Sequence, residues 1–121
     1  PANRVTLRKV TVVADVGPII NRSGAVSQIQ GAVIDGYSAM VSQKITMENG
    51  VIAETNLDSY PVLRIDAAPE VDVFFIESDY APTGLGEPAL PPLAPAVANA
   101  IFSATGRRIR KMPLSELGYS V

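Results

Sequence analysis

The chain has 121 residues, a formal net charge of −2, 47 % hydrophobic residues and 18 % charged residues. This length fits one domain or part of one, and the balance of charge gives no general attraction to nucleic acid. Cysteine and histidine are both absent, which excludes disulfides, thiolate sites and histidine-based triads. No apolar stretch approaches the ~20 residues that a transmembrane helix needs, so no membrane span is predicted.

The first third of the chain predicts a strand followed by a helix. Residues 5–16 are rich in valine and threonine, which favour a strand. Asn21 or Ser23 can cap the next element. From residue 25 to residue 41 the apolar positions recur at helical spacing.

The middle of the chain predicts a hairpin and another strand. Asn49 and Gly50 stand between short apolar runs at residues 44–47 and 51–53, and an Asn-Gly pair in that setting is a strong hairpin signal. Residues 71–76 have a weak alternation that indicates a strand.

A long loop and a second helix complete the pattern. Residues 79–92 are dense in proline and glycine, and unstructured loops of this length are usually functional or disordered. The stretch 93–104 is apolar nearly all round, which predicts a helix buried on most sides, and Gly106 can end it. The predicted order is β-α-β-β-β-α, a single α+β unit.

The first predicted helix carries two groups of candidate residues. Gln28 and Gln30 lie on one turn, and their amides could recognise donor and acceptor edges of a cofactor; an ordinary exposed helix face is the alternative. Gly31 and Gly36 each cost about 1 kcal/mol relative to alanine inside a helix. Their presence indicates close packing or a nearby ligand.

Glu87 is the candidate catalytic residue in the loop 82–88, Pro-Thr-Gly-Leu-Gly-Glu-Pro. The glycines allow close approach of backbone to a ligand and the prolines stiffen the loop. A carboxylate held there, just ahead of a helix whose dipole favours an anion, suits a general base. The alternative is a glutamate on a surface turn.

The basic run 107–111 could contact phosphate, but cations are also favoured and solvated at the end of a helix. The acidic overall balance argues against a nucleic-acid partner.

Five motifs together resemble the end of the molybdopterin-binding subunit of the xanthine oxidase and aldehyde oxidase family. The closest likeness is to large subunits of bacterial aldehyde dehydrogenases similar to isoquinoline 1-oxidoreductase. The motifs lie at residues 15–21, 28–32, 56–61, 82–88 and 94–101. The likeness extends over about residues 5–113 and implies that residues 1–121 are one C-terminal fragment of a larger molybdenum-cofactor-binding domain.

The resemblance assigns roles to three residues and none to a protein metal ligand. Glu87 is implied to be the general base that takes the proton from a molybdenum-bound hydroxide, so that oxygen from water attacks an aldehyde or N-heterocycle. Gln28 is implied to hydrogen-bond the pterin, and Gly86 to bring backbone close to the metal centre.

The same resemblance implies cofactors and partners. The cofactor would be molybdenum-molybdopterin, in its cytosine dinucleotide form, shared with the remaining segments of the same large subunit. Iron–sulfur clusters would lie on a small partner subunit. The chain alone is expected to be inactive, and the compartment, bacterial cytoplasm or periplasm, is left open. The alternative function is a non-catalytic structural or assembly module derived from the same fold.

Overall fold

A computed structural model describes residues 3–121 and has the predicted order of elements. The helices and strands are β1 (Lys9–Ala14), α1 (Arg22–Val41), β2 (Met47–Glu48), β3 (Val51–Ile52), β4 (Glu70–Phe75) and α2 (Leu93–Thr105). Two short 3-10 turns, η1 (Ile65–Ala67) and η2 (Leu114–Leu117), lie before β4 and after α2. The prediction of an α+β fold is confirmed.

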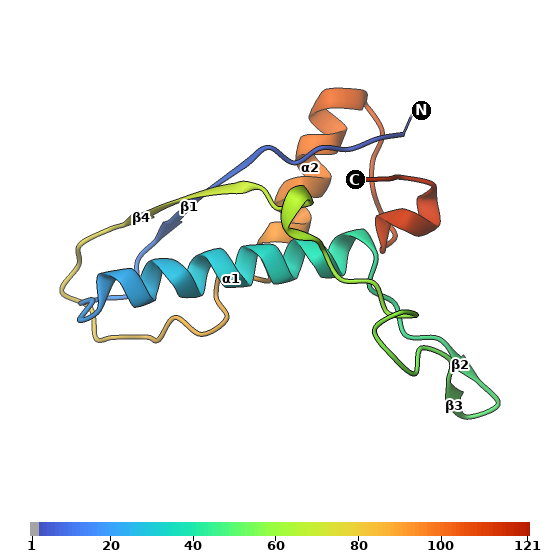
Figure 1. Cartoon of the computed structure of the whole chain (residues 1–121). Helices are drawn as coiled ribbons and strands as arrows, with labels where there is room; N and C mark the ends of the chain where they lie inside the picture. Colours follow the sequence, from blue (N-terminus) through green and yellow to red (C-terminus); the bar gives the residue numbers. More distant parts are fainter. Residues whose placement is uncertain (1–2) are drawn as a thin grey trace.

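β1 and β4 form a parallel two-stranded sheet, and α1 crosses beneath it (Figure 1). The register runs from Lys9 opposite Glu70 to Ala14 opposite Phe75. β1 is shorter than the predicted strand 5–16, because only residues 9–14 find a partner strand. β2 and β3 pair with each other in a separate antiparallel hairpin.

The core is built on one face of α1. Asn21 caps this helix, its side chain accepting the Gly24 N–H at 2.9 Å. The buried positions of α1 recur every three or four residues, as expected for one helical face. They include Ile29, Val33, Tyr37 and Met40.

α2 packs against α1 and ends at Gly106, which has φ of 73° and adopts the left-handed conformation. The prediction that α2 is buried on most sides is wrong for this chain. Its buried residues are Leu93, Val97, Ala98 and Ile101, whereas Ala96, Ala100 and Phe102 on the remaining surface are exposed. The physical reason is that the described residues supply packing partners for only one side of the helix.

Residues 42–64 form an arm that extends away from the body at the end of α1 (Figure 1). The Asn49-Gly50 turn has φ of 51° and 82° at its two residues, the left-handed conformations that a tight hairpin requires. The Glu54 carboxylate accepts the Thr46 N–H at 2.6 Å and holds the two sides of the arm together. The predicted hairpin is confirmed.

The C-terminal segment returns to the body after α2. Leu114 and Tyr119 enter the core, and the Val5 N–H donates to the Ser120 carbonyl at 2.8 Å. Ordered structure therefore continues beyond α2 and past Pro113.

Candidate functional site

The three residues predicted to serve the cofactor come together between α1 and the loop that precedes α2. Gln28 Nε2 donates to the Gly86 carbonyl at 3.3 Å, although the two residues are 58 positions apart. Glu87 follows directly in the loop, and all three residues are exposed. The fold thus brings the predicted amide, backbone and carboxylate groups to one place.

These groups line an open hollow of about 310 Å³. α1 contributes one wall and the loop contributes the other. The lining residues are Gln28, Gly31, Ala32, Asp35, Gly86, Glu87 and Leu90. Two carboxylates, Asp35 and Glu87, therefore lie on a surface that also presents amide and backbone hydrogen-bonding groups.

Sequence reasoning missed Asp35 as a member of this site. The helical positions of Gln28, Gly31, Ala32 and Asp35 are separated by three, one and three residues, so they share one face of α1. That spacing is visible in the sequence, but only the position of the loop reveals that this face is the one that lines the hollow.

The two glycines of α1 have different surroundings. A Cβ on Gly36 would lie 3.1 Å from the Leu90 carbonyl oxygen, so Gly36 allows the loop to pack closely on the helix. A Cβ on Gly31 or on Gly86 would meet no atom within 4 Å. Close packing therefore explains Gly36, whereas Gly31 and Gly86 leave space in the hollow.

A second, largely apolar hollow of about 270 Å³ adjoins the first at Gln28. Its lining includes Ile20, Pro82 and Leu85. Gln28 stands between the two hollows. The first hollow is the better candidate for proton chemistry because it contains the carboxylates.

The segment after β1 contacts and positions the start of the loop at residues 79–92, which carries Glu87. Gly17 has φ of 75°, and a Cβ there would lie 2.6 Å from the Tyr80 carbonyl oxygen, so only glycine fits. The Thr83 N–H donates to the Val16 carbonyl at 3.2 Å, and Ser78 donates to Asp15 at 2.5 Å. These contacts give residues 15–17, Asp-Val-Gly, a structural role: they position the loop that carries Glu87.

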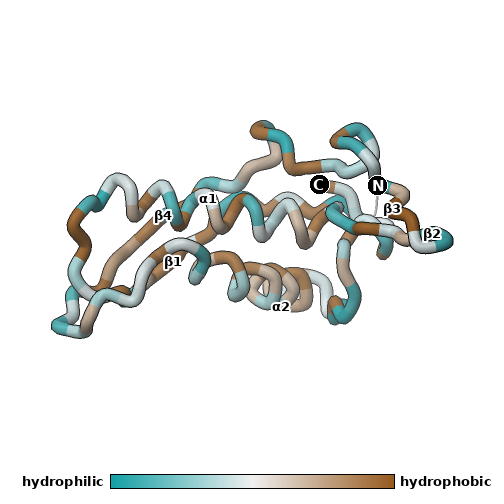
Figure 2. The backbone as a smooth tube through the Cα atoms, turned by 90° about the horizontal axis from the view of Figure 1, so that it is seen from below, coloured by the Kyte–Doolittle hydropathy of each residue, from teal (hydrophilic) through white to brown (hydrophobic). Residues whose placement is uncertain are grey.

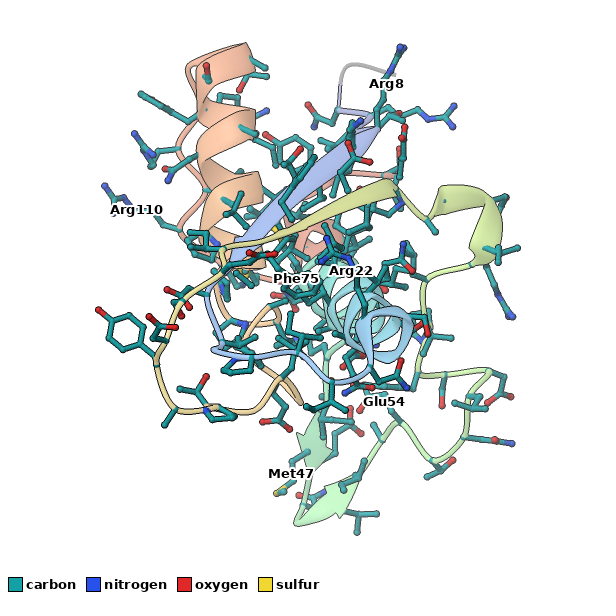
Figure 3. All side chains as sticks on the ribbon, turned by 90° about the vertical axis from the view of Figure 1, so that its left-hand side faces the viewer. Arg8, Arg22, Met47, Glu54, Phe75 and Arg110 are labelled. Atoms are coloured by element: carbon teal, nitrogen blue, oxygen red, sulfur yellow. The ribbon has the colours of Figure 1, made fainter. Side chains whose placement is uncertain are left out.

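The beginning of α1 is also fixed against the sheet. Figure 3 shows Arg22 beside Phe75, at the end of β4, with the guanidinium carbon 5.6 Å from the ring centroid. This contact links the start of α1, the helix that bears Gln28, to the end of β4.

Glu87 lies ahead of the first turn of α2. α2 begins at Leu93 with no acidic residue in its first turn. Between Glu87 and the helix the chain makes two tight turns, in which the N–H groups of Leu90 and Leu93 donate to the carbonyls of Glu87 and Leu90. The effect of a helix dipole falls off within the first turn, so the expectation that α2 favours the anionic form of Glu87 stays a prediction.

The basic run 107–111 is largely engaged within the chain. The Arg108 guanidinium stacks 3.6 Å from the Phe102 ring centroid and donates to Asn99 at 2.7 Å. Arg107 lies 5.5 Å from the Tyr119 ring centroid, and Lys111 pairs with Glu116 at 2.9 Å. These contacts favour a structural role for the run over phosphate binding.

Within residues 3–121 no cluster of three or more acidic or other ligand side chains could hold a metal ion. In the same part of the chain, neither helix has both the length and the apolar character needed to cross a bilayer.

Comparison with known proteins places the chain in a family. A family model described as "Molybdopterin cofactor-binding domain" matches residues 2–69. The chain is 40 % identical over 110 residues to a membrane-bound pyrroloquinoline-quinone aldehyde dehydrogenase of Gluconacetobacter polyoxogenes, and the match covers 91 % of this chain and 14 % of that protein. It is 30 % identical over 112 residues to the beta subunit of isoquinoline 1-oxidoreductase of Brevundimonas diminuta, covering 93 % and 14 %.

A solved structure has the same fold. Quinoline 2-oxidoreductase from Pseudomonas putida 86 superposes with a TM-score of 0.79 at 19 % identity, covering 90 % of this chain and 15 % of that one. The chain therefore spans about one seventh of the length of the curated relatives that it matches. The family model over residues 2–69, together with the relative at 40 % identity, establishes that the chain belongs to the molybdopterin cofactor-binding domain family.

Proposed function

We propose that this chain is the C-terminal part of the large subunit of a molybdenum-dependent oxidoreductase, with Glu87 as the general base. The observation that carries the proposal is the convergence of Gln28, Gly86 and Glu87 on one open hollow. These are the residues to which the family resemblance assigns the pterin contact, the close backbone approach and proton transfer.

The residues present fit such a cofactor. The two glycine positions without neighbours, Gly31 and Gly86, leave a concave surface free for a flat ligand. Gln28 donates one amide hydrogen to the Gly86 carbonyl. Its second N–H and its carbonyl oxygen remain able to bind acceptor and donor groups of a pterin. Gly86 and Gln28 brace each other, so a ligand that contacts one meets the other at a fixed position.

When bound, the molybdenum cofactor supplies the two-electron oxidation and activates water. Glu87 accepts the proton lost by the water-derived oxygen nucleophile. Glu87 belongs to a loop fixed at residue 17 and packed on α1 at Gly36, so the backbone that carries the carboxylate is held beside α1. A positioned base of this kind contributes about 10²–10⁴-fold to the rate.

The proposed substrate class follows the names of the relatives, and the proposed assembly and cofactor form follow the family resemblance. An aldehyde or an N-heterocycle is the proposed substrate, because these are the substrate classes named for the Gluconacetobacter and Brevundimonas relatives. The other segments of the same subunit, and a small subunit carrying iron–sulfur clusters, are the proposed partners. The cytosine dinucleotide form of molybdopterin is the proposed cofactor.

The test is Glu87→Gln in the complete subunit with its partners. Turnover should fall at least ~10²-fold, while molybdenum content and the folded state stay unchanged. Glu48→Gln, on the hairpin, is the control and should leave turnover within twofold. Near-normal turnover in Glu87→Gln would refute the role of this carboxylate.

Native mass spectrometry with metal analysis distinguishes the enzyme from a non-catalytic assembly module. Molybdenum within a larger complex supports the enzyme. A metal-free subunit, or one that holds pyrroloquinoline quinone in place of molybdenum, contradicts the proposed cofactor.

A further inference from the structure

One edge of β1 has no partner strand among residues 3–121. β4 pairs with the other edge. The Glu70 N–H donates to the Arg8 carbonyl at 3.0 Å, and the Ile76 N–H donates to the Ala14 carbonyl at 2.9 Å. In a parallel ladder, alternate residues of a strand direct both backbone groups to the same neighbour. These two bonds therefore fix which residues of β1 face β4.

The alternation assigns the remaining backbone groups to the open edge. Val10, Val12 and Ala14 face β4, so the N–H and C=O groups of Lys9, Thr11 and Val13 point away from it. No described residue bonds to these groups. The edge thus presents three donors and three acceptors at the spacing of a β-strand.

An apolar groove runs along this edge. Two hollows of about 220 and 200 Å³ share Val12, Val13, Ala89 and Pro92, so they form one continuous depression between β1, the loop at residues 79–92 and the start of α2. Its lining is almost entirely apolar, with Thr11 and Asp15 as the polar members. Figure 2 shows the matching hydrophobic colouring of β1 and of neighbouring α2.

Most of β1 lacks the features that protect an exposed edge. Residues 10–14 contain no charge and no proline, which are the usual means of preventing unwanted pairing. Lys9 is already engaged with Asp72, at 2.5 Å, on the outer face of the sheet. On the same face Val13 and its register partner Phe74 are 60 % and 55 % exposed. Parallel sheets are normally covered on both faces.

We infer that the open edge of β1 binds an extended strand from the part of the complete subunit that lies outside these 121 residues. This inference rests on the proposed function, in which the chain is one part of a larger subunit. The backbone groups of Lys9, Thr11 and Val13 require a partner that offers alternating backbone donors and acceptors, which is a β-strand. The groove requires that this strand carry apolar side chains on the face toward Ala89 and Leu93.

The relatives make such a partner available within one polypeptide. The chain corresponds to 14 % of the Gluconacetobacter and Brevundimonas proteins. The added strand would lie beside the loop that carries Glu87, because Leu85 and Pro88 line the same groove. Strand addition would therefore also support the candidate site from the side opposite α1.

Hydrogen exchange of the complete subunit tests the inference. The amides of Lys9, Thr11 and Val13 should exchange as slowly as those of Val10 and Val12. An edge open to solvent would leave the three amides exchanging at least ~100-fold faster than their neighbours, and that alternating pattern would overturn the inference.

A pair of substitutions provides an independent measurement. Thr11→Pro removes the N–H that faces the open edge and spares the ladder to β4, whereas Thr11→Ala removes the side chain and keeps the N–H. In the complete subunit, Thr11→Pro should raise the rate of limited proteolysis at least ~10-fold, and Thr11→Ala by less than twofold. Equal rates would overturn the inference, because proline is tolerated on an edge that faces solvent.

The outcomes separate this inference from the proposed function. Fast exchange at Thr11 in a subunit with full molybdenum content and normal turnover overturns the strand and leaves the function intact. Slow exchange at Thr11 in a metal-free, inactive subunit supports the added strand and contradicts the proposed function. Slow exchange in the isolated 121-residue chain, together with dimerisation, would identify a second copy as the occupant and would also overturn the inference.

Discussion

Gln28 connects two segments whose separation in sequence is large, and it does so through a single hydrogen bond to the Gly86 carbonyl. The bond orients the amide, and it also holds the loop residue that precedes Glu87. Loss of the side chain would therefore affect the proposed cofactor contact and the position of the loop together.

Gln28→Ala in the complete subunit is expected to weaken retention of the cofactor by about threefold to tenfold, which is the usual net effect of one hydrogen bond. Molybdenum per subunit after extensive dialysis is the measurement. Ser27→Ala, at the neighbouring exposed position of α1, is the control and should retain the metal. Unchanged molybdenum content in Gln28→Ala would remove this residue from the cofactor site.

At the scale of elements, α1 packs against the loop at one of its two central glycines and borders the open hollow at the other. Gly36 faces Leu90 of the loop and Leu93, the first residue of α2, whose nearest atoms lie 3.1 and 3.3 Å from the point that a Cβ would occupy. Gly31, five residues earlier, faces the open hollow. One helix therefore packs the loop at one point and leaves room beside it at another.

Gly36→Ala and Gly31→Ala should consequently have opposite effects on stability. Gly36→Ala should destabilise the protein by about 1–3 kcal/mol through overpacking and lower the melting temperature. Gly31→Ala should stabilise the helix by up to about 1 kcal/mol, yet it should lower molybdenum content because the methyl group enters the hollow.

Thermal melting and metal analysis on the two variants decide this prediction. A fully loaded Gly31→Ala subunit would mean that the space beside Gly31 is not used by the cofactor. A Gly36→Ala subunit that melts like wild type would mean that the loop shifts to accept the methyl group at no cost.

For the molecule as a whole, one acidic residue connects three segments. Glu116 of η2 pairs with Lys44, at the base of the arm, and with Lys111, which follows α2. Hydrogen bonds from Lys44 and then from Lys111 lower the pKa of the Glu116 carboxyl below its ordinary value of 4.5. The cluster ties the C-terminal segment to the arm.

A lowered pKa in the folded state contributes stability above the ordinary value, and this contribution is lost as pH falls through the folded-state value. Glu116→Gln should therefore lower the melting temperature at pH 7, and its difference from wild type should shrink below pH 4.5. The difference at pH 7 should also shrink in high salt, because these side chains are partly exposed. Glu77→Gln, outside the cluster, is the control. A difference that does not change with pH would contradict the electrostatic role.

The apolar surface is the other feature of the whole molecule. Side chains such as Ile20, Leu57 and Ile65 are 71–99 % exposed, and the hydrophobic segments of the arm are visible along the tube in Figure 2. Together with the uncovered side of α2, this surface agrees with a unit that packs against further polypeptide.

Local chemistry alone determined the elements of this protein. Apolar spacing at 3.6 residues defined α1, Gly106 defined the end of α2, and Asn49-Gly50 defined the hairpin, because each signal acts within a few residues of chain. The sequence also predicted the loop around Glu87, because a rigid glycine-proline loop with one carboxylate is a local property.

Only the tertiary structure decided how these parts meet. The hydrogen bond from Gln28 to Gly86, the membership of Asp35 in the hollow and the different reasons for Gly31 and Gly36 all depend on contacts between segments far apart in the sequence. The uncovered side of α2 and the open edge of β1 depend on which segments are present to cover them. Periodicity in a sequence shows that one face of an element is apolar. Chain topology and segments distant in the sequence determine what packs on that face.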